Sequence, residues 1–430
     1  MQNRSDAFID SLDRRVEDIA SACTACGACA EACPTLAIAG IDSSYPSALT
    51  AGVRNVLRGG EGPEASEDWA KMCCGSGHCL TVCPEGINPR FMLNMARRAI
   101  TQANPEPDRR AAGKAAFQKM SRGVRVISRL SLPPHLLEKL SPRSHPECDE
   151  VPDFVFYTGC NMLKTPHIGL LCLDVLEALG FSYEAQGGPS ACCGILPTRP
   201  GDTALGGRQA FGTLDRMAAS KTSQVLSWCP TCQIQFGETA IPAYREITGT
   251  NLDMTMFPVW LAGQLDRLRP MLKKRVEKRV AVFEYAGELG VMEAVRALLG
   301  AVPGLEVVKI ETSAIGYTGT ASVQLGSYLN DTIEAAYKEA KALGVDVFVG
   351  IYHSDHRRLA GQEADWPFTI QNYMELVGES MGFAREDRFK ELKLMADADA
   401  IMAASAGMIA EHRLNAEEVR ESVIKDLLEG

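Results

Sequence analysis

The chain carries fifteen cysteines in 430 residues, and their spacing is the strongest chemical signal in the sequence. Eight lie between positions 23 and 83, and a second set of five lies at positions 160, 192, 193, 229 and 232. In a cytosolic protein, clustered thiols serve as metal ligands or redox groups more often than as disulfides. We therefore expect both groups to bind metal, and we interpret the isolated Cys148 and Cys172 as structural.

The first four cysteines have the spacing of a cubane iron–sulfur site. Cys23, Cys26, Cys29 and Cys33 are followed by Pro34, which gives the run C-x2-C-x2-C-x3-C-P. In this run three thiolates hold one [4Fe–4S] cubane, and the fourth reaches a second cluster. A zinc knot is the weaker interpretation, because it normally needs only two cysteine pairs.

A second run supplies the partner that such a module requires. Cys73, Cys79 and Cys83 precede Pro84 with the same spacing, but Ser76 stands at the second ligand position. Crossed ligation predicts one cubane held by Cys23, Cys26, Cys29 and Cys83, and another held by Cys33, Cys73, Cys79 and a fourth ligand.

The fourth ligand of the second cubane is open between two outcomes. In the first, Cys74 shifts into the site and completes a [4Fe–4S] cluster, which we favour because Gly75 and Gly77 make the loop pliable. In the second, Cys74 is a bystander, and the empty corner at Ser76 gives a [3Fe–4S] centre.

Composition and charge exclude several classes of function. The chain is 46% hydrophobic and 23% charged, which is typical of a globular protein, and its length favours two or three domains. A net charge of −10 argues against binding to nucleic acid or to an anionic membrane surface. No apolar run approaches ~18 residues, so we expect no transmembrane segment. Residues 1–20 lack the apolar core of an export signal, which predicts a cytoplasmic protein.

We expect an α+β multidomain fold. Residues 1–100 predict a mostly helical, ferredoxin-like module with two clusters. Residues 101–150 predict a linker, interpreted as a solvated helical connector, with a docking patch for an acidic partner as the alternative. Strands and helices then alternate, as in βαβ units with parallel sheets, and residues 151–270 and 271–384 predict two pseudo-repeated α/β domains. Residues 385–430 predict two C-terminal helices that cap the second domain or bind a neighbour.

The five later cysteines fall at the ends of predicted strands or in the loops that follow them. Cys160 follows the strand "DFVFYTG", Cys192 and Cys193 follow the second strand, and Cys229 and Cys232 follow the third. The carboxyl ends of parallel strands are where open α/β sheets place their sites. Three loops that bring thiolates to this edge predict a metal cluster.

The motifs "TGC", "ACCG" and "CPTC" resemble one CCG domain of the heterodisulfide reductase family. Nearly the whole chain resembles the iron–sulfur C subunit of that reductase fused to its catalytic B subunit, as in the D-type subunit. The resemblance implies a non-cubane [4Fe–4S] cluster bound by all five cysteines. It also implies a flavin-containing partner of the reductase A type or another flavoprotein. Similar fusions serve glycolate and lactate oxidation, so the resemblance defines the cofactors better than the substrate.

A second CCG domain is visible as an internal repeat, offset by about 125 residues. The segment "RVAVFEYAG" corresponds to "DFVFYTGC", "SAIGYTG" to "PSACCG", and "VFVGIYHSDH" to "QVLSWCPTC". None of the ligand positions keeps its cysteine, and the five become Gly287, Tyr317, Thr318, His353 and His356. Without soft sulfur donors, this half cannot hold a thiolate-rich cluster.

Three interpretations of the second half stay open. It is kept for packing alone, or its histidines act as acid–base groups or stabilise a leaving thiolate. In the third interpretation His353 and His356, together with Asp355, bind a zinc ion.

We predict an oxidoreductase subunit that passes electrons through two cubanes to or from the five-cysteine cluster. That cluster handles one sulfur of a disulfide, thiol or sulfur-carrier substrate, and the other sulfur leaves toward His353, Tyr317 and His356. One alternative is an electron-transfer subunit of a flavoprotein dehydrogenase, without thiol chemistry. Another is that the C-terminal half is only a scaffold for assembly.

Overall fold

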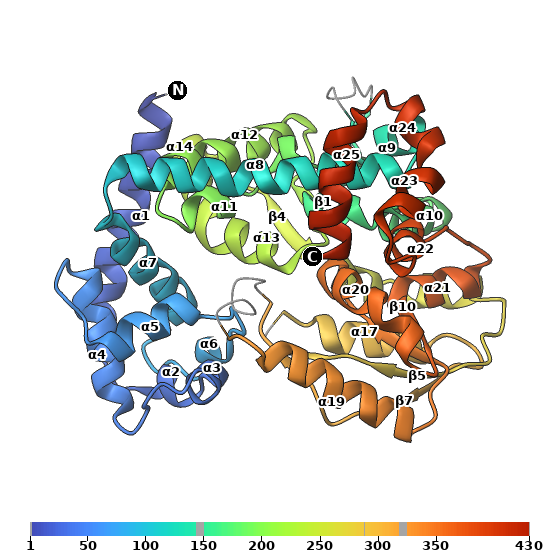
Figure 1. Cartoon of the computed structure of the whole chain (residues 1–430). Coiled ribbons are helices and arrows are strands. Elements are labelled where there is room, and N and C mark those ends of the chain that lie inside the picture. The colour runs from blue at the N-terminus through green and yellow to red at the C-terminus, as the bar shows by residue number, and fades with distance from the viewer. Residues whose placement is uncertain (1, 143–149, 288, 318–324, 430) are drawn as a thin grey trace.

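A computed structural model of the chain describes residues 2–142, 150–287, 289–317 and 325–429. Cys148 and Thr318 lie outside the described residues. Figure 1 shows a helical N-terminal module, two α/β domains, and C-terminal helices that lie beside the end of one long helix. The expected α+β multidomain fold, with a helical first module and parallel sheets after it, is confirmed.

The N-terminal module is built from helices around a small apolar core that includes Val53, Trp69 and Leu93. Short helices begin just after cysteine loops, and Pro34 and Pro89 stand in the first turn of their helices, where a missing N–H costs nothing. Its helices are α1 (Gln2–Ala22), α2 (Ala28–Glu31), α3 (Pro34–Ile38), α4 (Pro46–Leu57), α5 (Glu64–Met72), α6 (His78–Thr81) and α7 (Pro89–Gln102).

The first α/β domain is a four-stranded parallel sheet in the order β2-β1-β3-β4. The central strand β1 is buried along its whole length, as expected for a strand covered on both faces. Its strands are β1 (Phe154–Gly159), β2 (Tyr183–Gly187), β3 (Gln224–Ser227) and β4 (Asp253–Met256). Its helices are η1 (Asn161–Lys164), α10 (Pro166–Ala178), η2 (Pro189–Ala191), α11 (Ile195–Thr198), α12 (Thr203–Ala219), α13 (Pro230–Ile234), η3 (Gln235–Ala240), α14 (Ile241–Thr248), α15 (Phe257–Ala262), α16 (Leu265–Leu268) and η4 (Arg269–Met271).

The second α/β domain repeats this topology, because its parallel sheet has the order β10-β9-β5-β7. Read from the other edge, this is the strand order of the first sheet. Its strands are β5 (Arg279–Val282), β7 (Glu306–Val308), β9 (Val347–Gly350) and β10 (Thr369–Asn372), with a small ladder of β6 (Tyr285–Ala286) and β8 (Ala314–Ile315). Its helices are α17 (Val291–Gly300), α19 (Tyr328–Ala342), α20 (His353–Leu359), η5 (Ala360–Asp365) and α21 (Tyr373–Met381).

The two α/β domains share one apolar core. Helices α10 and α15 of the first domain pack on helices α21 and α17 of the second domain, respectively. The ring of Trp228 stacks on that of Tyr373 with 5.7 Å between the ring centroids, and both rings are fully buried. The two halves are therefore held together by apolar packing across a wide surface.

The expectation of a solvated connector is right for only half of residues 101–150. Helix α8 (Glu106–Ser131) is exposed along much of its first half, whereas Val126, Ile127 and Leu130 are buried against the C-terminal helices. Figure 1 shows α8 crossing the molecule to reach α25. Helix α9 (Pro134–Leu140) then leads to the first α/β domain.

The expectation of two C-terminal helices is wrong, because the segment forms more and shorter helices. Ala396 and Arg413 adopt left-handed backbone conformations, with φ of 52° and 53°, which interrupt the helical path. Apolar side chains from these helices, including Phe389 and Val423, meet the buried half of α8. The helices are α22 (Arg388–Leu394), α23 (Ala398–Ala404), α24 (Ala406–Glu411), α25 (Ala416–Ser422) and the π-helical η6 (Val423–Leu428).

A buried ion pair joins the N-terminal module to the first α/β domain. Arg90 on α7 donates to the Oε1 atom of Glu238 on η3 at 2.7 and 3.0 Å, and Asn88 donates to the same oxygen at 2.9 Å. Arg90 also donates to the carbonyl of Gly75 at 2.9 Å, and it is only 7% exposed. This arginine therefore fixes the loop around Gly75 against the α/β domain.

We expect Arg90→Ala to destabilise the protein by about 3 kcal/mol, because it removes the charged partner of the largely buried Glu238 carboxylate, which then keeps, among the described residues, only the hydrogen bond from Asn88. The measurement is the first thermal transition, followed by circular dichroism under anaerobic conditions. The matched control is Arg14→Ala, since Arg14 also links the module to the α/β domain, through the exposed Glu246. Equal shifts of the transition in the two variants would contradict a special role for the buried pair.

Candidate functional site

The five later cysteines meet at the carboxyl edge of the first sheet. Cys160 follows β1, Cys192 and Cys193 lie between η2 and α11, and Cys229 precedes α13. Neighbouring thiols interact directly, Cys192 with Cys193 and Cys232 with both Cys193 and Cys229. Three loops from neighbouring strands thus deliver their sulfur atoms to one place, as the parallel topology requires.

A glycine makes this convergence sterically feasible in the loop after β2. Gly194 has φ of +80°, and a Cβ atom there would lie 2.1 Å from the carbonyl oxygen of Gly206. Its N–H donates to the sulfur of Cys192 at 3.4 Å. The third residue of the C-C-G motif must therefore be glycine, because any side chain would push α12 away from the cysteines.

The surroundings of the five cysteines fit a negatively charged cluster. Burial, followed by the nearby Cys193 and Cys229 thiols, raises the pKa of Cys160 to about 12. Burial, followed by the positive charge of Arg97, lowers the pKa of Arg199 to about 10. Among the described residues, the buried Nε of Arg199 has no hydrogen-bond partner. Soft sulfur donors bind iron, and an iron cluster held by thiolates is negatively charged. Such a cluster would therefore provide a counter-charge for the Arg199 guanidinium.

The eight N-terminal cysteines separate into two neighbourhoods. Burial, together with the thiols of Cys23, Cys26 and Cys83, raises the pKa of Cys29 to about 11. Burial, together with the thiols of Cys74 and Cys33, raises the pKa of Cys73 to about 12, and Cys79 faces Cys73 and Cys33 as well. This grouping is the one that crossed ligation of two cubanes needs, and the ligand assignment itself stays a prediction.

Cys74 lies deep in the second neighbourhood and receives hydrogen bonds on its sulfur. It is 2% exposed, and the hydroxyl of Thr35 donates to its Sγ at 3.2 Å. Ser76 donates to the same sulfur through its backbone N–H. The indole of Trp69 donates in the same way to Cys33, at 3.2 Å. Hydrogen bonds of this kind stabilise a ligating thiolate, so they favour Cys74 over the empty corner.

The second α/β domain lies against both cysteine sites at Tyr317. Its backbone N–H donates to the carbonyl of Cys74 at 2.8 Å, and its own carbonyl accepts from the hydroxyl of Thr231 at 3.3 Å. Thr231 lies inside the C-P-T-C motif. A cavity of about 40 Å³ beside this contact is lined by Cys73 and Thr231 together with Arg97 and Arg199. The second cubane loop and the five-cysteine site are therefore neighbours.

The side chain of Tyr317 packs against two neighbours at the carboxyl edge of the second sheet. A Cβ atom on Gly287 would lie 2.3 Å from the Tyr317 ring, and that ring packs edge-on against Tyr352 at 6.0 Å between centroids. Gly287 and Tyr317 occupy two of the five degenerate ligand positions. This aromatic packing favours the interpretation in which the second half is kept for packing.

The two histidines of the second domain are buried and point to different partners. His353 is 4% exposed, and burial, followed by the charge of Arg357, lowers its pKa to about 3, so it is neutral at physiological pH. His356 is fully buried, and its Nε2 lies 2.5 Å from Asp387. Their catalytic role, like that of Tyr317, stays a prediction, and their burial favours the packing interpretation.

Asp355 does not join these histidines in a zinc site. Its carboxylate accepts from the backbone N–H groups of Ile351 and Tyr352, at 3.1 and 2.7 Å, and from the hydroxyl of Tyr285 at 2.8 Å. The zinc interpretation as stated for His353, His356 and Asp355 therefore lacks its third ligand.

Several residues around these sites carry no signal in the sequence. Arg199 and Arg357 face the five cysteines from elements that no motif marks. His167 and Asp387 meet His356 from other parts of the chain. Only the position of Arg199, shortly after the C-C-G motif, hinted that it lies near the cluster.

Two family models match the chain, a 4Fe-4S dicluster domain over residues 22–88 and a cysteine-rich domain, CCG, over residues 154–237. The chain thus carries a dicluster domain followed by a CCG domain. No solved structure matches it. None of the helices in the described part of the chain is both long and apolar enough to cross a bilayer.

Three curated relatives place this CCG-domain protein among redox proteins. It is 22% identical to the D subunit of the dihydromethanophenazine:CoB–CoM heterodisulfide reductase of Methanosarcina barkeri, over 84% of this chain and 94% of the relative. It is 24% identical to the glycolate oxidase iron-sulfur subunit of Escherichia coli, over 42% of this chain and 48% of the relative. It is 24% identical to the B subunit of the fumarate reductase (CoM/CoB) of Methanothermobacter marburgensis, over 57% of this chain and 47% of the relative. The chain thus spans about half the length of the last two relatives and most of the heterodisulfide reductase relative.

We expect Cys74→Ser to convert the second cubane of this CCG-domain protein to a three-iron centre. Iron should fall by about one per chain, and the oxidised protein should show the electron paramagnetic resonance signal of a [3Fe–4S] cluster. The matched control is Ser76→Ala, which changes the other candidate position and should leave both cubanes intact. Unchanged cubane signals in Cys74→Ser would show that Cys74 is a bystander.

We expect Arg199→Met to lower the reduction potential of the five-cysteine centre by about 50 mV, because a nearby positive charge stabilises the more negative, reduced form. A redox titration followed by electron paramagnetic resonance measures this shift. Arg208→Met is the control, since Arg208 is exposed on α12. A potential that does not move in Arg199→Met would exclude this electrostatic role.

Proposed function

We propose that the chain passes electrons between two cubane clusters and one five-cysteine cluster, and that the latter handles a disulfide, thiol or sulfur-carrier substrate. The cubane module would exchange electrons with a flavoprotein partner. The observation that carries the proposal is the contact through Tyr317, whose backbone touches the Cys74 loop on one side and Thr231 on the other. This contact supports a continuous route from the second cubane to the five cysteines.

The five-cysteine site has an accessible side. Cys160 and Cys229 are partly exposed, whereas the other three cysteines of the set are buried. When bound, the non-cubane cluster supplies redox-active iron that binds sulfur. This chain contributes the positive charge beside it, because Arg357 of the second domain faces both Cys160 and Cys229. A guanidinium at this place attracts a thiolate to the exposed side and favours the charge-separated products of disulfide cleavage.

The same arginine is held in place by the degenerate half. Its Nε donates to the backbone carbonyl of His353 at 3.3 Å, and burial lowers its pKa, an effect that the thiol of Cys160 opposes. Lys164 lies on the other side of this region and pairs with Asp426 at 2.8 Å. In this proposal the second domain contributes a positively charged side chain that lines the five-cysteine site of the first domain. It does not contribute a second cluster.

A second candidate function is electron transfer alone, within a flavoprotein dehydrogenase. It is favoured by the similarity to the glycolate oxidase iron-sulfur subunit and by the burial of His353 and His356. In that case the five-cysteine centre is a relay that binds no substrate sulfur. Both candidates need the same clusters, so cluster content alone does not separate them.

We expect millimolar dithiol to change the electronic spectrum of the wild-type protein and to leave that of Cys193→Ser unchanged. Cys193 is 2% exposed at the centre of the five-cysteine set, so its loss disrupts that cluster while the cubanes stay intact. The matched control is Cys172→Ala, which removes a buried cysteine of the same domain outside the set.

Iron analysis of the anaerobic protein accompanies the thiol titration. About 12 irons per chain correspond to three full clusters, and about 8 correspond to the two cubanes alone. A wild-type spectrum that thiols and disulfides leave unchanged, in protein with about 12 irons, contradicts sulfur chemistry and favours the pure electron relay.

A further inference from the structure

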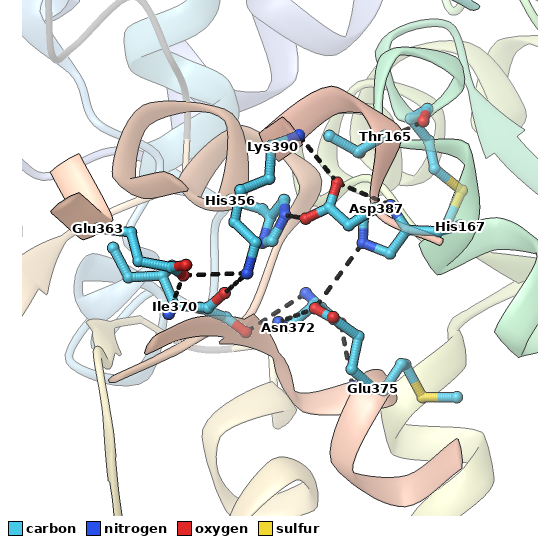
Figure 2. Close-up of polar contacts among 12 residues, drawn as sticks. Thr165, His167, His356, Glu363, Ile370, Asn372, Glu375, Asp387 and Lys390 are labelled. Atoms are coloured by element: carbon cyan, nitrogen blue, oxygen red, sulfur yellow. Dashed lines mark hydrogen bonds and ion pairs between the residues drawn. The ribbon is translucent and has the colours of Figure 1, made fainter. Parts of the chain in front are cut away.

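A group of two histidines and two carboxylates is buried where three parts of the chain meet. His167 stands in the first turn of α10, in the first α/β domain. His356 and Glu375 come from α20 and α21, in the second α/β domain, and Asp387 precedes α22 in the C-terminal segment. Their ligand atoms all lie within 4.8 Å of one another. Figure 2 shows the four side chains turned toward a common point.

The four side chains lie in direct contact or close to it. The Nε2 of His356 lies 2.5 Å from Asp387, and the Nδ1 of His167 lies 3.3 Å from the other oxygen of the same carboxylate. The Nε2 of His167 lies 3.7 Å from Glu375. The two imidazole rings meet edge-on at 5.1 Å between centroids.

His167 is the residue that hydrogen bonding within the protein does not satisfy. It is 1% exposed, and in the described part of the chain neither ring nitrogen has a hydrogen-bond partner with suitable geometry. Both nitrogens nevertheless face carboxylate oxygens, of Asp387 and Glu375. A neutral imidazole carries only one N–H, so only the protonated ring could donate toward both carboxylates. A bound cation facing a ring nitrogen and the two carboxylates would take the place of that second proton.

Both carboxylates are held in place by hydrogen bonds from the backbone. Asp387 caps α22 by accepting from the N–H of Lys390 at 3.1 Å, and Glu375 accepts from the N–H of Asn372 at 2.6 Å. The ammonium group of Lys390 is engaged elsewhere, with Glu363 at 2.9 Å.

We propose that His167, His356, Glu375 and Asp387 bind one zinc ion that clamps the two α/β domains and the C-terminal helices together. Imidazole nitrogen and carboxylate oxygen are established zinc donors, and four protein ligands make a closed, tetrahedral site. A divalent ion with two neutral histidines and two carboxylates has no net charge, which suits a buried position. Ligand atoms around tetrahedral zinc lie about 3.4 Å apart, since each bond is about 2.1 Å long. On binding, the His356–Asp387 contact therefore opens from 2.5 Å, and the more distant ligand atoms move closer together.

The site is separate from the cysteine centres and independent of the proposed redox function. Of the residues expected in a zinc site, His353, His356 and Asp355, this quartet contains only His356. Its other three ligands come from distant parts of the chain. A metal ion here stabilises the folded protein by linking segments that are far apart in the sequence.

The experiment uses the full chain with its iron–sulfur clusters, prepared anaerobically, supplied with one equivalent of Zn²⁺ and then desalted. Elemental analysis should find one zinc per chain. The X-ray absorption spectrum at the zinc edge should show only nitrogen and oxygen neighbours at about 2.0 Å and no sulfur at about 2.3 Å. The absence of retained zinc, or a sulfur shell that places the ion at cysteines, would overturn the proposal.

A pair of matched variants tests the ligands themselves. Asp387→Asn keeps the helix cap, because asparagine caps helices as well as aspartate does, but it removes the ligand charge. Zinc content should fall at least tenfold. Asp397→Asn makes the same change at the cap of α23, where the aspartate accepts from Ala400, and should retain full zinc. Equal zinc content in the two variants would contradict the assignment, and unchanged iron content in both shows that the clusters and the fold persist.

Discussion

The organisation of this protein depends on bringing many thiols close together inside the fold. Burial, followed by the neighbouring thiols, raises the pKa of Cys160 to about 12, so a thiolate at this position is costly without a positive charge beside it. A parallel sheet brings the cysteines together, because its strand ends deliver three loops to one point. The glycine of C-C-G avoids a steric clash, because without a side chain it lets α12 approach the loop closely.

Positive charge is placed where the thiolates are. Arg199 faces the five cysteines from the first domain and Arg357 from the second. The Arg90–Glu238 pair holds the cubane loop against the same domain. Since each buried charge needs a compensating one, clusters and arginines stabilise each other, and the relative placement of module and domains becomes part of the redox site.

The second α/β domain shows what becomes of a cluster-binding fold when its cysteines are absent. It keeps the strand order of the first domain, and the ring of Tyr317 packs closely against Gly287 at its carboxyl edge. Its loops have taken other tasks. The backbone of Tyr317 connects the two cysteine sites, and His356 joins the buried quartet at the interface with the first domain. The second domain thus lines the cysteine sites of the first domain and packs against it.

The sequence by itself determined the cysteine motifs, the helical first module and the two parallel sheets, because ligand spacing and strand periodicity are local properties. It also pointed to the loss of the second cluster, since the positions equivalent to the cysteines are visible in the repeat. Only the tertiary structure decided that half of α8 is buried, that the C-terminal segment breaks into short helices, and that His353 and His356 have different partners. The meeting of His167 with Asp387, and of Tyr317 with Cys74, depends on packing between distant segments, which leaves no periodic trace in the sequence.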